Sequence, residues 1–181
     1  MESHELSSSF CVLDIETAGG SMPSFPEGFD LLLTGVRHGE TYGMYTAAPE
    51  SMAEMAQFLA NFPGPIVTFN GAKFDLPLLD LWCQQILGTP LPALRHYDLM
   101  LEVVKQAGHR ISLDKLSFYT FGEKKIPWDH RRNAQVWETE PHLLIDYNRV
   151  DLDLTHELFM RVLRQEPMFL GDKTIVLPLP D

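Results

Sequence analysis

Four acidic side chains occupy positions in this 181-residue sequence where an ordinary fold would prefer apolar or neutral residues. They are Asp14, Glu16, Asp75 and Asp151. If the three stretches that carry them converge, their negative charge requires a concentrated positive charge, and bound divalent cations are the usual source. Two such cations can activate a water molecule and hold the attacking and leaving oxygens of a displacement at phosphorus. The pattern therefore predicts metal-dependent phosphoryl transfer.

The first two acids stand two residues apart in a predicted strand over residues 10–16. On a strand, Asp14 and Glu16 share one face while Ile15 points to the other. Neighbouring carboxylates repel, and each makes the other harder to ionise unless a cation intervenes. A polar strand end that faces solvent remains the alternative explanation of this pair.

Asp75 follows the Asn70-Gly71 turn and stands near the start of a predicted helix. Considered alone, it is better explained as a residue that stabilises the helix start. The turn, however, follows an apolar strand at 66–69 and would place Asp75 at the carboxyl end of a sheet strand. This is the usual location of active sites in α/β proteins.

Asp151 falls within the apolar stripe of the longest predicted helix, residues 141–164, one turn after Tyr147. An aspartate in a buried stripe needs a partner, which makes Asp151 the strongest single candidate. The Tyr147 hydroxyl could orient an attacking water. The alternative for Tyr147 is a core aromatic whose tip reaches the surface.

Apolar periodicity predicts an α/β fold with the element order β-β-β-α-β-α-β-α. We expect a mixed central sheet of about five strands, an antiparallel meander followed by parallel strands, flanked by helices. The segment 121–140 carries many charges and is predicted to be a long loop. The expected strands are 10–16, 31–36, 41–46, 66–69 and 94–100, and the tail holds an expected edge strand at 174–177. Two helices are expected to begin at Pro49 and near Phe74, and a third to follow the fifth strand through Val104. Two further helices are expected over 112–119 and 141–164.

Length and composition favour a single globular domain over 1–181, with a core at about 10–164 and a tail at 165–181. The sequence is 45% hydrophobic and shows neither a basic, apolar leader nor a long apolar run, which predicts a cytoplasmic protein with no membrane partner. Cys11 and Cys83 are expected to be buried reduced thiols. The net charge of −11 argues against a protein that coats nucleic acid, but not against an enzyme that grips a short strand locally.

Basic and aromatic side chains alternate within the predicted loop and could supply phosphate contacts and a platform for a base. An ordinary solvated loop is the alternative. The residues concerned are Lys124, Lys125, Trp128, His130, Arg131 and Arg132.

The stretches Asp14-Ile-Glu16, Asn70-Gly-Ala-Lys-Phe-Asp75 and Tyr147-Asn-Arg-Val-Asp151 resemble, in that order, the three exonuclease motifs of the DEDD superfamily. Members of that superfamily are similar to the proofreading domains of DNA polymerases and to RNase D. Tyr147, four residues before Asp151, matches the tyrosine-bearing (DEDDy) branch. The likeness is closest to small bacterial predicted exonuclease domains and covers about residues 10–164.

The resemblance implies a ribonuclease H-like fold and two Mg²⁺ or Mn²⁺ ions on the four acids. It also implies 3′–5′ hydrolysis of single-stranded DNA or RNA 3′ ends to nucleoside monophosphates. Asp98 resembles an auxiliary acid that lies behind the metal ligands in many members. The expected contacts to the strand end are Thr17, Asn70, Lys73 and Phe74.

Two features depart from the family pattern, both near the expected place of the terminal nucleotide. Ala18 replaces a common threonine, and the loop 19–28 is long. The main rival hypothesis is a non-catalytic nucleic-acid-binding or protein-binding module with the same fold. An endonuclease or another phosphodiesterase is the third. The sequence leaves open whether a helicase or polymerase partner delivers the strand.

Overall fold

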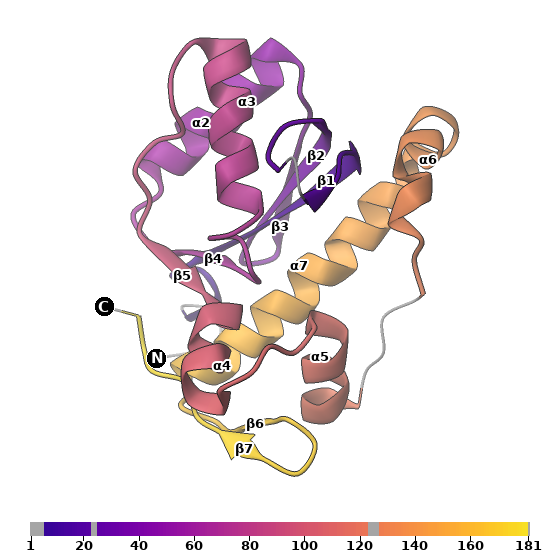
Figure 1. The fold of residues 1–181 in the computed structure, drawn as a ribbon. Helices are drawn as coiled ribbons and strands as arrows, with labels where there is room; N and C mark the ends of the chain where they lie inside the picture. Colours follow the sequence, from indigo (N-terminus) through magenta and orange to yellow (C-terminus); the bar gives the residue numbers. More distant parts are fainter. Residues whose placement is uncertain (1–5, 23–24, 123–126, 181) are drawn as a thin grey trace.

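The computed structural model describes residues 6–22, 25–122 and 127–180. Its centre is a five-stranded mixed sheet with the strand order β3-β2-β1-β4-β5, which confirms the predicted α/β, ribonuclease H-like architecture (Figure 1). The first three strands are antiparallel, and β4 and β5 join parallel to β1. The strands are β1 (Cys11–Gly19), β2 (Phe29–His38), β3 (Thr41–Tyr45), β4 (Ile66–Thr68) and β5 (His96–Asp98).

Strand β1 lies between β2 and β4, and apolar side chains cover both of its faces over its first half. Cys11, Leu13 and Ile15 belong to one core cluster, and Val12 belongs to the other, because alternate side chains of a strand point to opposite faces. The same alternation places Asp14 on the Val12 side of the sheet.

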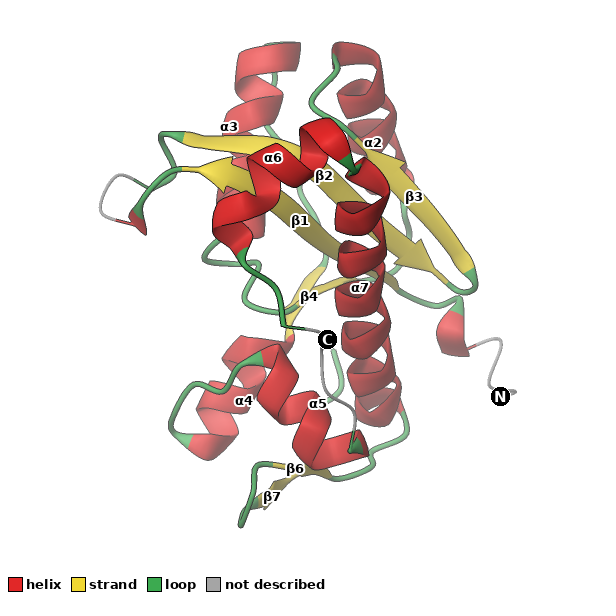
Figure 2. Cartoon of the chain, turned by 90° about the vertical axis from the view of Figure 1, so that its right-hand side faces the viewer, coloured by secondary structure: helices red, strands yellow, loops and turns green. Residues whose placement is uncertain are grey.

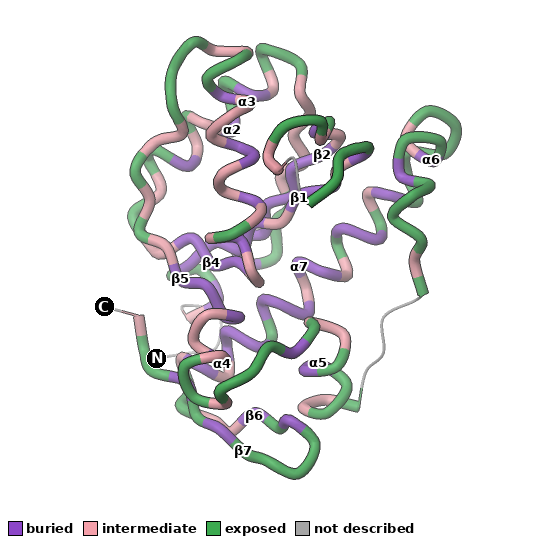
Figure 3. The backbone as a smooth tube through the Cα atoms, viewed as in Figure 1, coloured by how far each residue is buried: buried purple, intermediate pink, exposed green. Residues whose placement is uncertain are grey.

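Helices cover both faces of the sheet (Figure 2). α2 (Pro49–Asn61) and α3 (Asp75–Leu87) pack on the face of Cys11 and Leu13. α7 (Pro141–Leu163) crosses the opposite face and contacts β1, β2 and β4. Buried positions recur along most of α7, so this helix forms a wall of the core rather than a surface addition (Figure 3).

The prediction that 121–140 forms a loop is wrong for its second half. A 3₁₀ turn, η2 (His130–Arg132), leads into α6 (Asn133–Thr139), which packs against β1 and α7. The Asp129 side chain accepts a hydrogen bond from the Arg131 backbone N–H and so caps the turn. These elements are short, and packing against the sheet stabilises them more than local propensity does. Lys124 and Lys125 lie outside the described residues.

The remaining elements lie together beyond β5. α4 (Leu99–Ala107) and α5 (Leu113–Phe121) pack near a small hairpin of β6 (Met168–Phe169) and β7 (Thr174–Ile175). The predicted edge strand at 174–177 therefore pairs with β6 rather than with the main sheet. In the described part of the chain, no helix combines the length and apolar character that crossing a bilayer requires.

Candidate active site

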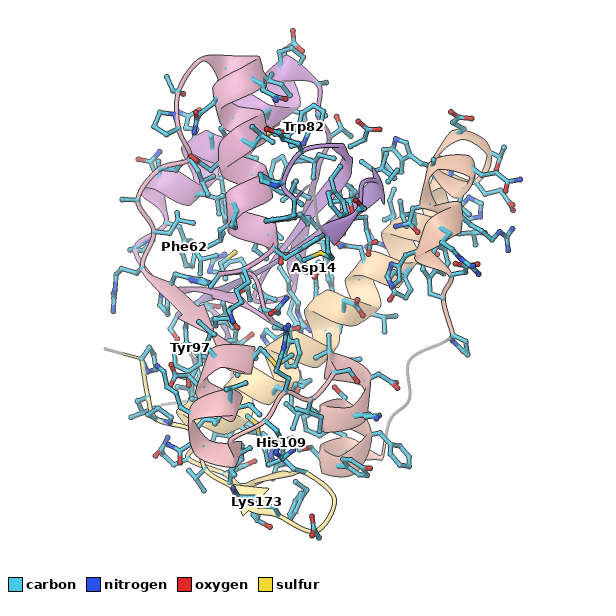
Figure 4. All side chains as sticks on the ribbon, viewed as in Figure 1. Asp14, Phe62, Trp82, Tyr97, His109 and Lys173 are labelled. Atoms are coloured by element: carbon cyan, nitrogen blue, oxygen red, sulfur yellow. The ribbon has the colours of Figure 1, made fainter. Side chains whose placement is uncertain are left out.

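Strand β1 and helix α7 bring three of the predicted acids together. Asp14 and Glu16 on β1 and Asp151 on α7 place ligand oxygens within 4.8 Å of one another. Glu16 and Asp151 are buried and Asp14 is half-buried. In Figure 4, the labelled Asp14 lies between the ribbons of β1 and α7. Oxygen ligands at such separations suit one shared hard cation such as Mg²⁺ or Mn²⁺.

A β-bulge follows the acidic pair. Glu16 faces Leu33 of β2, whereas Thr17 faces Leu31, so the register shifts between these two residues of β1. Bulges re-aim side chains and are frequent beside active sites. Because the bulge comes only after Glu16, side chains alternate regularly between the two faces of β1 as far as Glu16. Glu16 therefore lies on the same face as Asp14.

Asp75, the first residue of α3, reaches the same cleft from the other side of β1. Its Oδ1 accepts a hydrogen bond of 3.2 Å from the backbone N–H of Ile15. All four predicted acids line one cleft of about 780 Å³. Burial raises the pKa of Asp75 to about 7; the charges of Asp98 and Asp151 add to this, and backbone N–H groups oppose it. The donor set fits divalent cations, because negative charge is costly here without a counter-charge.

The raised pKa of Asp75 predicts how the stability of the metal-free protein depends on pH. Well below pH 3.8, the ordinary pKa of this carboxyl, it is protonated whether the chain is folded or unfolded. As the pH rises towards about 7, the folded protein holds the proton more tightly than the unfolded chain does, so stability falls. Asp75→Asn should remove this loss and stabilise the metal-free protein at pH 8 by about 1–3 kcal/mol.

Urea denaturation in chelator at pH 5 and pH 8 measures this difference. Asp172→Asn, which changes an exposed carboxylate in the same way, is the matched control. Excess Mg²⁺ should stabilise wild type more than Asp75→Asn. Parallel stability profiles for wild type and Asp75→Asn between pH 5 and pH 8 would contradict the prediction.

Asp98 organises the turn that carries Asp75. Its carboxylate accepts backbone N–H bonds of 2.9 Å from Asn70, Ala72 and Met100 and a longer one from Leu101. It therefore caps α4 and fixes the Asn70 turn at the same time. Asn70 itself has φ of 73°, a left-handed conformation that asparagine tolerates better than most residues.

The residues predicted to contact the nucleic-acid strand divide into two groups. Thr17, Asn70 and Phe74 line the cleft, whereas Lys73 is exposed and lies outside its lining. The Phe74 ring packs against Phe29, with ring centroids 5.5 Å apart and planes nearly perpendicular. These two rings give the cleft an apolar side next to its acids.

Arg110 is a cleft residue that sequence reasoning missed. It lies between α4 and α5, and its Nη2 donates a 2.7 Å hydrogen bond to Asn70 Oδ1. Arg110 is exposed and lines the same cleft as the four acids. No motif surrounds Arg110, and only the fold brings it to Asn70.

Tyr147 is held by aromatic neighbours. Its ring stacks on Trp128, with centroids 4.6 Å apart and planes at 23°, and meets His130 edge-on at 5.7 Å. Tyr147 covers one face of the Trp128 ring, so the predicted platform for a base requires the other face. Arg131, another expected phosphate contact, forms a two-pronged pair with Asp129.

Two buried asparagines, also missed from the sequence, each donate to one carboxylate of β1. Asn148 Nδ2 lies 2.8 Å from Asp14 Oδ2. Asn133 Nδ2 lies 3.2 Å from Glu16 Oε2. Asn148 follows Tyr147 directly, so its place beside a predicted catalytic tyrosine was a usable signal. Asn133 lay in the segment predicted as a loop, and its sequence context gave no signal of a role beside Glu16.

No protein-family model and no curated protein matches this sequence. Among solved structures, the chain is similar to the family B DNA polymerase from the hyperthermophilic archaeon Pyrobaculum calidifontis, with a TM-score of 0.68 and 18% sequence identity. The alignment covers 85% of this chain and 24% of the polymerase, so the chain spans about a quarter of that protein's length. At this identity the likeness shows a shared fold.

Proposed function

We propose that this protein is a metal-dependent 3′–5′ exonuclease that hydrolyses single-stranded nucleic acid from its 3′ end and releases nucleoside monophosphates. One observation carries the proposal: the acids of three separate motifs line a single cleft, and three of them have ligand oxygens within 4.8 Å of one another. The resemblance of these motifs to those of DEDD exonucleases supplies the direction of hydrolysis and the single-stranded substrate.

In this proposal, Asp14, Glu16, Asp75 and Asp151 hold two Mg²⁺ or Mn²⁺ ions. When bound, such ions provide an activated water and neutralise charge at phosphorus. The Tyr147 hydroxyl, one helical turn before Asp151, orients the attacking water. Phe74 packs against the terminal base. Thr17 and Asn70 contact the terminal nucleotide, as does Lys73 if its flexible side chain turns towards the strand.

Arg110 fits the role of a phosphate contact, because it is an exposed cation that lines the cleft of the four acids and Asn70 fixes its direction. We expect Arg110→Gln to raise KM for a short oligonucleotide about 10-fold with little change in kcat, and to weaken the salt dependence of KM. Arg95→Gln removes the same charge from an exposed site outside this cleft and serves as the control. An unchanged KM for Arg110→Gln would remove Arg110 from the binding surface.

The decisive assay compares linear and circular single strands of DNA and RNA, labelled at the 3′ or the 5′ end, with Mg²⁺, Mn²⁺ or chelator. We expect mononucleotides from linear strands only, and only with metal. Cleavage of circles would favour an endonuclease. Strand binding without hydrolysis and without Mn²⁺ uptake in calorimetry would favour the non-catalytic binding module.

A further inference from the structure

A series of side-chain contacts through Trp128 and Asn133 links Tyr147 to Glu16. It runs from the Tyr147 ring to the stacked Trp128 ring, from the Trp128 indole N–H to Asn133, and from Asn133 to Glu16. We call Trp128 and Asn133 together the brace. The brace joins the predicted water-orienting hydroxyl on α7 to a predicted metal ligand on β1.

Asn133 can hold Glu16 in one orientation because its amide oxygen and its amide nitrogen are both hydrogen-bonded. The side chain is 1% exposed. Its Oδ1 accepts a 2.7 Å bond from Trp128 Nε1, and its Nδ2 donates to Glu16 Oε2 and, at 2.9 Å, to the Thr17 carbonyl. These bonds fix which amide atom faces the carboxylate. Because the Thr17 carbonyl follows the bulge, Asn133 also anchors the backbone beside Glu16.

Trp128 makes both of its contacts with one rigid side chain. One ring face covers Tyr147, and the indole edge donates to Asn133. The contact with Tyr147 and the bond to Asn133 therefore depend on the position of the same ring. The ring of His130, edge-on to Tyr147, limits the remaining freedom of the phenol.

We propose that Trp128 and Asn133 are positioning residues that set the Tyr147 hydroxyl and the Glu16 carboxylate relative to each other; this inference rests on the proposed function. Removal of a group that hydrogen-bonds to a metal ligand commonly lowers metal affinity or activity by about 10–100-fold. A neutral amide suits the role, because it orients one Glu16 oxygen without competing for a cation as a carboxylate would.

The brace also explains why a charge-rich segment folds as η2 and α6. The two elements contact β1, and α6 also packs on α7. The buried Asn133 and Val136 are the residues of α6 that face the interior. Three residues of this segment, His130, Arg131 and Asn133, line the cleft.

Three variants test the brace in the full-length protein: Asn133→Ala, Trp128→Ala and Trp128→Phe. We expect Asn133→Ala to weaken Mn²⁺ binding in calorimetry about 10-fold, with part of the lost rate restored by excess Mn²⁺. Trp128→Ala should lower kcat about 10-fold with little change in KM. Trp128→Phe keeps a stacking ring but loses the N–H donor, so it should keep more of kcat than Trp128→Ala while losing Mn²⁺ affinity. Gln135→Ala removes an exposed amide from the same helix and is the matched control.

A second readout separates positioning from general stability. The indole N–H signal of Trp128 in a ¹⁵N NMR spectrum is identified by its loss in Trp128→Phe. It should shift when Mg²⁺ is added to wild type and stay in place when Mg²⁺ is added to Asn133→Ala. If Asn133→Ala does not fold, the two Trp128 variants decide the matter through kcat and Mn²⁺ affinity.

The outcomes distinguish the two proposals. Wild-type kcat and Mn²⁺ affinity in the folded brace variants, beside an active wild type, would overturn the brace and leave the exonuclease standing. A wild type that takes up no Mn²⁺ and hydrolyses no strand would overturn the exonuclease and the brace together.

Discussion

Replacing Asp151 by asparagine is expected to lower the rate of 3′-end hydrolysis on the order of 1,000-fold while the protein remains folded. Asp151 is the carboxylate that α7 contributes beside Asp14 and Glu16, and its ligand oxygen lies within 4.8 Å of theirs. Asparagine keeps the size and removes the charge. Folding should not suffer in the absence of metal, because one of several crowded negative charges is removed.

Release of labelled mononucleotides at saturating Mn²⁺, together with a melting curve in chelator, measures both effects. Asp146→Asn is the matched control, because it changes an exposed acid on the same helix in the same way. The Asp146 carboxylate forms a long ion pair, with 3.9 Å between its Oδ1 and Arg149 Nη1. We expect that control to keep wild-type activity. Substantial hydrolysis by purified Asp151→Asn would remove Asp151 from the metal centre and weaken the proposed function at its base.

The second large effect is expected from Gly35→Ala, at a position that no motif marks. Gly35 pairs with Asp14 across β1 and β2. A Cβ there would stand 1.7 Å from Asn148 Oδ1 and 2.9 Å from Leu152 Cδ1. The buried side chains of Asn148 and Leu152 must therefore shift, and α7 carries both of them. We expect the variant to lose roughly 1–3 kcal/mol of stability and most of its activity, because Asn148 would leave Asp14 and disturb α7 beside Asp151.

A stability control and a suppressor make the Gly35 test specific. Gly88→Ala imposes a backbone strain of about 1 kcal/mol, because φ there is 71°, but its Cβ meets nothing within 4 Å. That variant should lose stability and keep activity. Asn148→Ser, combined with Gly35→Ala, should recover part of the lost stability by relieving the clash. Normal activity in Gly35→Ala would show that the close approach of α7 to β1 is not needed.

Local patterns predicted the main elements because burial imposes simple periodicities on them. The continuous apolar run before Asp14 predicted a strand over 10–16, and β1 spans Cys11–Gly19. The 3.6-residue stripe around Asp151 predicted a helix over 141–164, and α7 spans Pro141–Leu163. The prediction of secondary structure failed where the local sequence pattern is weak. The η2–α6 segment has few apolar residues, and its structure depends on contacts such as that of Asn133 with Glu16, which no local pattern contains.

The candidate site shows the same division. The chain by itself determined which acids stand at a strand end, at a helix start and within a buried stripe, since these are properties of neighbouring residues. Only the tertiary structure decided that the acids share a cleft and that Asn133, Asn148 and Arg110 lie beside them. The reason is physical: the position of β1 between β2 and β4, and the crossing of α7 over it, result from pairing and packing between segments far apart in the sequence.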